Sequence, residues 1–246
     1  WSDLRTVDFM AAPPRASRLG HRLYGTLVTR DGERFTGYIA WDMDEIFGSD
    51  VLDGEADGRD REVPFADIRS IARNGSRSAR VLLVDGEALV LSGTNDVNSG
   101  NRDILVADPA LGEVRVEWDE FDRLEFAPPP AAIEVSTFDG GRRLRGTVET
   151  TSGETFSGLI RWDNDEEYTW EILDGQLRGG ADLDVEMGTI AAIERRGYST
   201  SVVTLRDGRR LELGDSNDVD EGNRGVYIQQ ADGRLVLVPW DTFRLV

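Results

Sequence analysis

The sequence predicts an all-β protein built from tandem repeats, and three observations predict it. Residues 22–126 and 143–246 match each other at an offset of 121–122 positions. Helical periodicity is nearly absent, because no window shows the i, i+3, i+4, i+7 apolar spacing of an amphipathic helix. Short alternating apolar runs are separated by turn sequences such as Asp-Gly and Asn-Asp, which is typical of short antiparallel strands.

The duplication is visible in short motifs. Trp41-Asp-Met-Asp-Glu corresponds to Trp162-Asp-Asn-Asp-Glu, and Asn95-Asp-Val-Asn-Ser-Gly-Asn-Arg corresponds to Asn217-Asp-Val-Asp-Glu-Gly-Asn-Arg. A period of this kind indicates a repeat architecture. We call residues 22–126 repeat 1 and residues 143–246 repeat 2.

Each repeat is predicted to contain two half-repeats with one plan: a strand, a glycine turn, a second strand, an acidic loop, a short strand, a turn of helix and a last strand. Asp31-Gly32 and Asp85-Gly86 lie between alternating apolar runs, which is a hairpin signal. Apolar residues three apart, beginning at Phe65 and again at Trp118, predict the helical turn with its closing strand. The strands expected in repeat 1 are Tyr24–Thr29, Phe35–Trp41, Arg80–Val84, Ala88–Leu91, Ile104–Ala107 and Glu113–Trp118.

This plan loosely resembles a small Sm-like barrel in the order of its hairpins, one-turn helix and closing strand. The resemblance is topological, and it implies tandem units that are small antiparallel β-barrels or sandwiches. A four-bladed propeller with one blade per half-repeat is the alternative architecture. The expected layout is an N-terminal strand and linker over residues 1–21, then repeat 1, a proline-rich linker over residues 127–142, and repeat 2.

Composition excludes several functional classes. The chain has 47 acidic and 28 basic residues, a net charge of −19, so we expect no contact with nucleic acid, which requires a basic face. Every basic residue is arginine, so Schiff-base and P-loop lysines are excluded, and the absence of cysteine excludes thiol catalysis. The single histidine, His21, is expected at the surface. No apolar run approaches the roughly 18 residues of a membrane helix, so no membrane insertion is expected.

Acidic loops are the first candidate site. Asp42, Asp44 and Glu45 recur in repeat 2, and oxygen ligands at alternate positions suit Ca²⁺. The alternative is that these carboxylates are solvated turn residues that cap backbone amides. Asp96 and Asp218 lie one half-repeat after Asp42 and Asp163 in the sequence. If the half-repeats pair about a local two-fold axis, these four loops would converge as two sites, each with loops from different half-repeats. The candidate cation ligands are Asp42, Asp44, Glu45, Asp96, Asp163, Asp165, Glu166 and Asp218.

The second candidate is the asparagine-rich loop of each repeat. Its arginine is predicted to clamp the aspartate of the same loop, Arg102 on Asp96 and Arg224 on Asp218, as a bidentate pair. Such a loop is either locked onto itself or contacts a ligand. The candidate ligand-binding residues are Asn95, Asn101, Arg102, Asn217, Asn223, Arg224 and Trp170.

Tryptophans divide into two groups. Trp41, Trp118, Trp162 and Trp240 occur at corresponding positions and are expected in the core, with a sugar-binding platform as the alternative. Trp170 has no counterpart, since position 49 is Ser49, and is therefore the better candidate for an exposed contact with carbohydrate.

The start of the chain is a candidate assembly element. Trp1-Ser-Asp-Leu-Arg-Thr-Val-Asp-Phe matches Trp118-Asp-Glu-Phe-Asp-Arg-Leu-Glu-Phe, as though it were the tail of a preceding repeat. Three interpretations are open: a surplus strand packed on its own chain, a longer array, and strand donation between molecules. The candidate assembly residues are Trp1, Leu4, Val7 and Phe9.

Together these features predict a non-enzymatic structural, assembly or binding module that associates with itself or with other repeat units, since a duplicated feature suits valency better than a single active site. We expect export from a bacterium, secreted or at the cell surface, with the cytoplasm as the alternative location. One alternative function is a calcium-dependent carbohydrate-binding module. A second is a hydrolase with a carboxylate pair.

Overall fold

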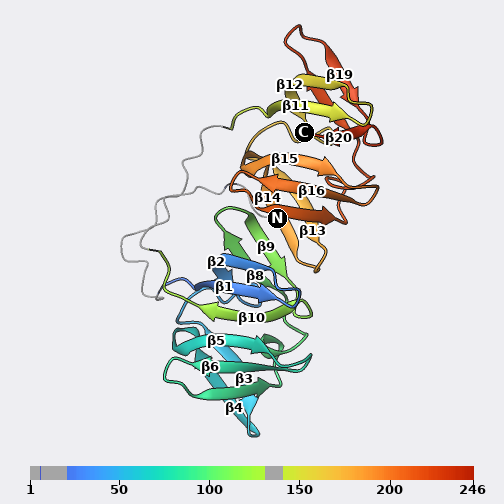
Figure 1. Cartoon of the computed structure of the whole chain (residues 1–246). Helices are drawn as coiled ribbons and strands as arrows, with labels where there is room; N and C mark the ends of the chain where they lie inside the picture. Colours follow the sequence, from blue (N-terminus) through green and yellow to red (C-terminus); the bar gives the residue numbers. More distant parts are fainter. Residues whose placement is uncertain (1–5, 7–20, 131–140) are drawn as a thin grey trace.

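The structure is a computed structural model that describes residues 21–130 and 141–246, together with Thr6. These residues form an almost entirely antiparallel β protein, which confirms the predicted fold class (Figure 1). Within them, no helix has the length and apolarity needed to cross a membrane. The candidate assembly residues Trp1, Leu4, Val7 and Phe9 lie outside the described residues, as does most of the expected linker.

Both repeats contain ten strands connected by short turns. Repeat 1 consists of β1 (Tyr24–Thr29), β2 (Arg34–Ala40), β3 (Val51–Ala56), β4 (Arg59–Pro64), η2 (Phe65–Asp67), β5 (Ile68–Arg73), β6 (Ser78–Leu83), β7 (Ala88–Ser92), η3 (Asn95–Val97), β8 (Ile104–Asp108), β9 (Gly112–Val116) and β10 (Phe121–Phe126). Repeat 2 consists of β11 (Arg145–Thr150), β12 (Thr155–Arg161), β13 (Ile172–Leu177), β14 (Asp182–Glu186), η4 (Met187–Thr189), β15 (Ile190–Arg195), β16 (Thr200–Leu205), β17 (Arg210–Gly214), β18 (Val226–Gln229), β19 (Leu235–Val238) and β20 (Phe243–Leu245). The elements labelled η are single turns of 3-10 helix.

The strand pairings form one unbranched series of twenty strands. In repeat 1 the order is β4-β3-β7-β6-β5-β10-β1-β2-β8-β9. The series continues into repeat 2 as β14-β13-β17-β16-β15-β20-β11-β12-β18-β19. This open order does not establish closure into barrels or into propeller blades, so the barrel and propeller interpretations remain predictions.

The order within a repeat is symmetric. Exchanging each strand of repeat 1 with the strand five places away in the chain converts β1–β2 into β6–β7, β1–β10 into β6–β5, β2–β8 into β7–β3 and β3–β4 into β8–β9. The central pair β5–β10 is converted into itself. Strands β4 and β9 are therefore equivalent positions at the two ends of repeat 1, as β14 and β19 are in repeat 2.

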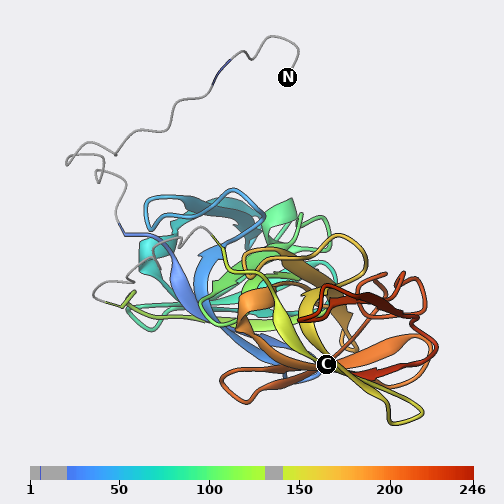
Figure 2. The same cartoon turned by 90° about the horizontal axis from the view of Figure 1, so that it is seen from above.

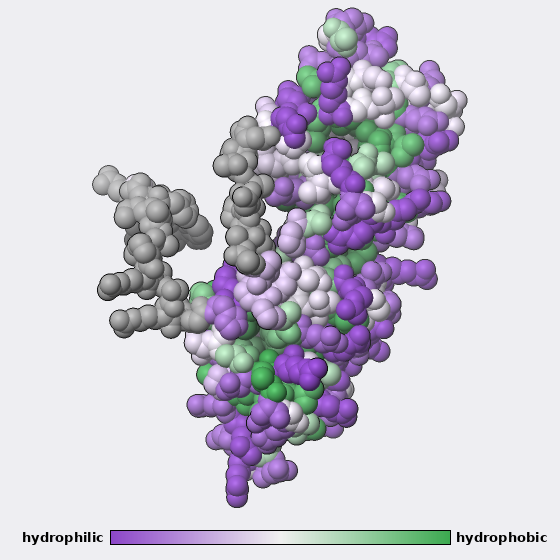
Figure 3. Space-filling model, turned by 60° about the vertical axis from the view of Figure 1, so that its left-hand side comes forward, coloured by the Kyte–Doolittle hydropathy of each residue, from purple (hydrophilic) through white to green (hydrophobic). Residues whose placement is uncertain are grey.

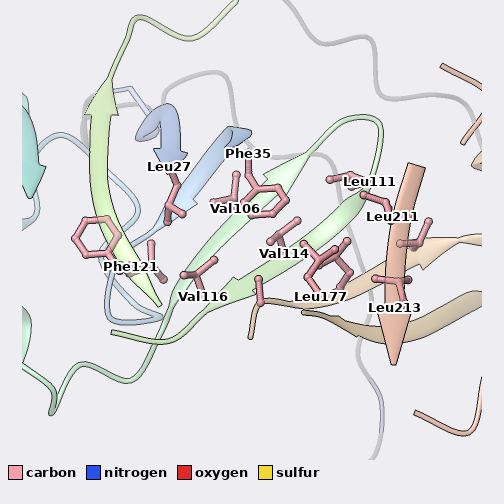
Figure 4. Close-up of a cluster of buried hydrophobic side chains, with 14 of the residues drawn as sticks. Leu27, Phe35, Val106, Leu111, Val114, Val116, Phe121, Leu177, Leu211 and Leu213 are labelled. Carbon is pink, nitrogen blue, oxygen red and sulfur yellow. The ribbon is translucent and has the colours of Figure 1, made fainter. Parts of the chain in front are cut away.

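One strand pair joins the repeats. β9 of repeat 1 pairs with β14 of repeat 2, and Val114 lies opposite Leu183. Figure 4 shows Leu111 and Val114 from repeat 1 beside Leu177 and Leu213 from repeat 2. All four of these side chains are buried, so the apolar core continues across the junction. Seen from above, repeat 2 is displaced to one side of repeat 1 (Figure 2).

The duplicated tryptophans lie in the core, as expected. Trp41, Trp118, Trp162 and Trp240 are all buried. The ring of Trp41 lies 6.3 Å from that of Trp118, and the ring of Trp162 lies 6.0 Å from that of Trp240, both edge to face. They fill the space under the acidic loops and are not available as a sugar platform.

One element differs from the expected plan. The single short strand predicted after the acidic loop is a hairpin, β3–β4 in repeat 1 and β13–β14 in repeat 2. In β3–β4 the turn is Asp57-Gly58, with φ of 53° and 72°, the conformation that a two-residue turn of this type needs. The turn signal is present in the sequence, but four of the six residues of β4 are charged and it lacks the apolar alternation by which strands are recognised, whereas β14 has this alternation in Leu183 and Val185.

Candidate functional site

The acidic loop and the asparagine-rich loop meet at one place in each repeat. β2 carries the acidic loop at its end, and η3 begins the asparagine-rich loop after β7. The indole Nε1 of Trp41 donates a hydrogen bond to the Asp96 carbonyl oxygen at 3.0 Å, and Trp162 makes the same bond to Asp218 at 2.9 Å. A buried tryptophan therefore fixes one loop against the other in both repeats.

The buried centre of the first site is Asp42. It has a φ of 48°, in the left-handed region that aspartate tolerates better than most residues. Its carboxylate accepts hydrogen bonds from Asn95 Nδ2 at 2.5 Å, from the backbone N–H of Arg102, and from the Arg102 guanidinium at 2.9 Å. The loss of water around this carboxylate is thus offset by several donors, one of them charged.

Repeat 2 reproduces this arrangement around Asp163. Its carboxylate accepts hydrogen bonds from Asn217 Nδ2 at 2.6 Å, from the backbone N–H of Arg224 and from the Arg224 guanidinium at 2.9 Å. Asn223 receives a hydrogen bond from the Gly225 N–H and donates one to the Asp218 carbonyl oxygen, so it holds the loop itself.

The arginines contact different partners from those expected. Arg102 binds Asp42 and Asp44, the second at 2.5 Å, and Arg224 binds Asp163 and Asp165. Within the described residues no ion pair joins Arg102 to Asp96. The expected clamp within a single loop is therefore wrong. The arginine reaches across to the acidic loop, where it pairs with the buried Asp42 and the exposed Asp44.

Asp96 and Asp218 play a different part. An Asp96 carboxylate oxygen accepts the backbone N–H of Asp53 at 2.8 Å, and Asp218 accepts that of Asp174 at the same distance. Burial raises the pKa of the Asp96 carboxyl, and it raises the pKa of Asp218 to about 6. Both side chains hold the start of a neighbouring strand.

Glu45 and Glu166 are incompletely hydrogen-bonded, and in repeat 1 the buried Nδ2 of Asn101 also has no partner among the described residues. One carboxyl oxygen of each glutamate is buried and has no hydrogen-bond partner. Burial, reinforced by the neighbouring aspartates, raises the pKa of each to about 8. At neutral pH these glutamates therefore hold a proton.

The chemistry available here is limited. Oxygens of Asp42, Asp44 and Glu45 lie within 4.8 Å of one another, a spacing that would suit a metal ion. The guanidinium of Arg102 already pairs with two of these carboxylates, Asp42 and Asp44, and a proton neutralises the third. In this state the residues form a loop locked by internal charge, and Ca²⁺ would have to displace both the arginine and the proton.

The chain matches no protein-family model, and no curated protein or solved structure shows significant similarity to it.

Trp170 lies apart from these loops. Its side chain is 48% exposed and stacks on Tyr168 with ring centroids 6.3 Å apart. Arg143 lies over the other ring of this pair, 5.5 Å from the Tyr168 centroid. The indole also covers Gly141, where an added Cβ would lie 2.1 Å from it. His21 is exposed, as expected.

Two of the grooves in the structure are not predicted by the sequence. The larger, of about 600 Å³, lies in repeat 2 and is lined by Gly146, Met187, Ala192 and Val246, among others. The corresponding space in repeat 1 is filled by the end of β10, where the Phe126 ring packs 5.9 Å from Phe65, the counterpart of Met187. This difference between the repeats becomes visible only when their structures are compared.

The smaller groove, of about 260 Å³, lies at the junction of the repeats. Arg115 from β9 and Asp182 and Asp184 from β14 line it. No motif marks this groove, because its walls come from strands that are not neighbours in the sequence.

Proposed function

We propose that this chain is a non-enzymatic structural module, in which β-repeats join edge to edge into one extended sheet. The observation that supports this function is the β9–β14 pair, which joins two repeats through backbone pairing and a shared core. A repeat that presents an equivalent strand at each end can be added in series, as in other repeat proteins. Both acidic sites lie inside their own repeats and hold loops in place, which suits a scaffold.

The surface fits this function. Figure 3 shows a mostly hydrophilic face with scattered hydrophobic areas, and the net charge is −19. A strongly charged surface keeps an extended protein soluble. The proposed setting is that of a bacterial protein secreted or displayed at the cell surface.

Substitution at the junction tests this function. Leu183→Arg places in β14 the residue that β4 carries at the corresponding position, Arg61, so it buries a charge between the repeats. We expect one cooperative unfolding transition for the native chain and two for this variant in scanning calorimetry, with a larger radius of gyration by X-ray scattering. Asp184→Arg, on the exposed face of the same strand, is the matched control and keeps one transition. Independent unfolding of the two repeats in the native chain would contradict the proposal.

Strand donation by the N-terminal segment is part of the proposed assembly. Asp8-Phe9 corresponds in sequence to Glu125-Phe126, which occupy in repeat 1 the space that is open as the groove in repeat 2, where Val246 already holds the position of Leu124. A synthetic peptide of residues 7–12 should bind the full chain in calorimetric titration. The same peptide with Phe9→Asp is the control and should not bind. Equal binding, or none by either peptide, would argue against donation.

A calcium-dependent carbohydrate-binding module is the second candidate. The cluster of Asp42, Asp44 and Glu45 and the exposed ring of Trp170 favour it. On this function, millimolar Ca²⁺ raises the melting temperature, and Asp44→Asn abolishes the rise. A structural module with loops locked by arginine shows no response, so differential scanning fluorimetry with CaCl₂ separates the two.

A further inference from the structure

The sheet has two free edges, and they lie at opposite ends of the molecule (Figure 1). Among the described residues, β4 of repeat 1 pairs only with β3, and β19 of repeat 2 pairs only with β18. A free edge presents unpaired backbone N–H and C=O groups, and proteins usually protect such edges with charged residues or proline.

The β4 edge is protected in this way. Its sequence is Arg59-Asp-Arg-Glu-Val-Pro64, and every side chain except that of Val63 is exposed. Along β4, the backbone N–H and C=O groups of successive residues point alternately toward β3 and away from it. Counted from the two-residue turn, the backbone of Pro64 points away from β3. Proline has no N–H to offer a further strand there.

The β19 edge ends at a proline in the same way, because Pro239 corresponds to Pro64, but the strand itself carries no charged residue. Its sequence is Leu235-Val-Leu-Val238, and the side chains of Leu235 and Leu237 are 59% and 45% exposed. Val236 and Val238 pack on the core instead. An apolar edge strand of this kind is an association site.

Backbone geometry shows which groups of β19 are free. The Gln230 N–H donates to the Arg234 carbonyl oxygen at 2.9 Å, so this pair faces inward. Because antiparallel pairs alternate, Val236 also faces β18, and the N–H and C=O of Leu235 and Leu237 point away from the sheet. In repeat 1 the corresponding residues are Glu113 and Arg115, which lie opposite Asp184 and Asp182 across the junction.

The β9–β14 junction therefore shows how another strand could pair with the free edge of β19. Strand β9 occupies in repeat 1 the position that β19 has in repeat 2, and β14 is its equivalent at the other end of a repeat. The register is centred on Val114 opposite Leu183, with one pair on either side whose side chains lie on the outer face. Two edges of equivalent type thus pair antiparallel about a local two-fold axis.

We propose that β19 pairs antiparallel with β19 of a second copy of this chain, with the two Val236 residues on the two-fold axis. Leu235 then lies opposite Leu237 of the partner subunit, and Val236 extends the core as Val114 does at the junction. The result is a closed dimer with one continuous sheet. This inference deepens the proposed structural function and rests on it.

The other strand edges fit less well. A β4–β4 pair with the same register would place Arg61 against the same arginine of the other copy, and Asp60 against Glu62, which are like charges. A β19–β4 pair would place Leu235 and Leu237 against Glu62 and Asp60. Only the β19–β19 pair joins apolar residues to apolar residues in all three central pairs.

Sedimentation equilibrium of the full chain between about 1 and 200 μM tests the proposal, a range that brackets micromolar affinity. We expect a monomer–dimer equilibrium, and any larger species that forms through strand donation should disappear with Phe9→Asp while the dimer remains. Leu235→Glu combined with Leu237→Glu places glutamates opposite each other in both outer pairs and should raise the dissociation constant by about tenfold or more. Leu235→Glu combined with Leu237→Arg places Glu opposite Arg instead and should keep the dimer.

Both double variants are expected to fold, because β9 carries Glu113 and Arg115 at the corresponding positions; circular dichroism checks this. Val90→Glu, on a half-exposed residue of β7 inside the sheet, is the matched control and keeps the dimer. A monomeric native chain, open-ended oligomers that persist with Phe9→Asp, or equal behaviour of the two double variants would overturn the proposed interface. A native monomer that still unfolds in one transition would leave the structural function standing.

Discussion

At the scale of single residues, the acidic sites are charge pairs that a cation would have to break. Asp42 is buried and accepts hydrogen bonds from Asn95 and Arg102, while Asp44 is exposed and shares the same guanidinium. The two carboxylates look alike in sequence, but because only Asp42 is buried, they contribute differently to the free energy of unfolding. Removing one partner of a buried pair leaves the other donors unsatisfied, whereas an exposed pair contributes little.

Asp42→Asn should therefore lower the free energy of unfolding by about 2–3 kcal/mol, somewhat less than for a fully buried pair because Arg102 is half-exposed. Urea denaturation followed by tryptophan fluorescence measures this. The control is Asp44→Asn, which should change the free energy by about 0.5 kcal/mol or less. Equal effects would show that the buried hydrogen bonds of Asp42 contribute nothing.

Protonated glutamates make stability depend on pH. The pKa of Glu45 and Glu166 is about 8 in the folded chain, against an ordinary value of 4.5. The folded state binds these protons more tightly, so their contribution is fully present below pH 4.5 and is lost as pH rises through 8. We expect the melting temperature to fall by several degrees across this window.

The double variant Glu45→Gln with Glu166→Gln should flatten that pH dependence and melt higher than the native chain at pH 8.5 and above, where the native glutamates are charged. Melting curves from pH 5 to 9 for both chains test this. The same slope in both would show that the dependence comes from other carboxylates.

At the scale of elements, the turns and strands follow the local sequence, while strand neighbours do not. Strand β1 begins and ends where its apolar run does, and β2 is shifted by one residue from the expected Phe35–Trp41. The pairing of β2 with β8 brings backbones together closely at Gly37. A Cβ at that position would lie 2.0 Å from the Ala107 carbonyl oxygen.

Gly37→Ala should consequently lower the free energy of unfolding by about 1–3 kcal/mol, because the clash is with backbone and cannot be relieved by a rotamer change. Thr36→Ala, on the neighbouring residue of the same strand, should have a smaller effect. Chemical denaturation of the two variants compares them. An unchanged Gly37→Ala midpoint would mean that β2 and β8 are further apart than described.

At the scale of the whole molecule, two features act together: one sheet that crosses both repeats, and a large excess of negative charge. The β9–β14 pair ties the repeats together and leaves β4 and β19 as the ends. The charge of −19 opposes the compact state through self-repulsion. Arginine pairs within each repeat neutralise part of it locally.

Raising NaCl from about 0.1 to 1 M shortens the Debye length from about 10 to 3 Å and should raise the melting temperature. Net repulsion outweighs the few ion pairs, most of which are exposed, in a chain with 47 acidic and 28 basic residues. Thermal unfolding across a salt series measures this. A fall in melting temperature would show that the ion pairs dominate.

Local sequence determined the fold class, the duplicated motifs, the hairpin turns and the buried tryptophans, because alternation, turn residues and repeats are properties of neighbouring positions. The sequence also identified both loops of each site as candidates, but it did not identify the partner of Arg102. That partner, the β3–β4 hairpin, the junction between Val114 and Leu183, and the contrast between the charged β4 edge and the apolar β19 edge depended on the tertiary structure. Each of these joins residues that are far apart in the chain. Their proximity follows from sheet register and core packing, which no local pattern encodes.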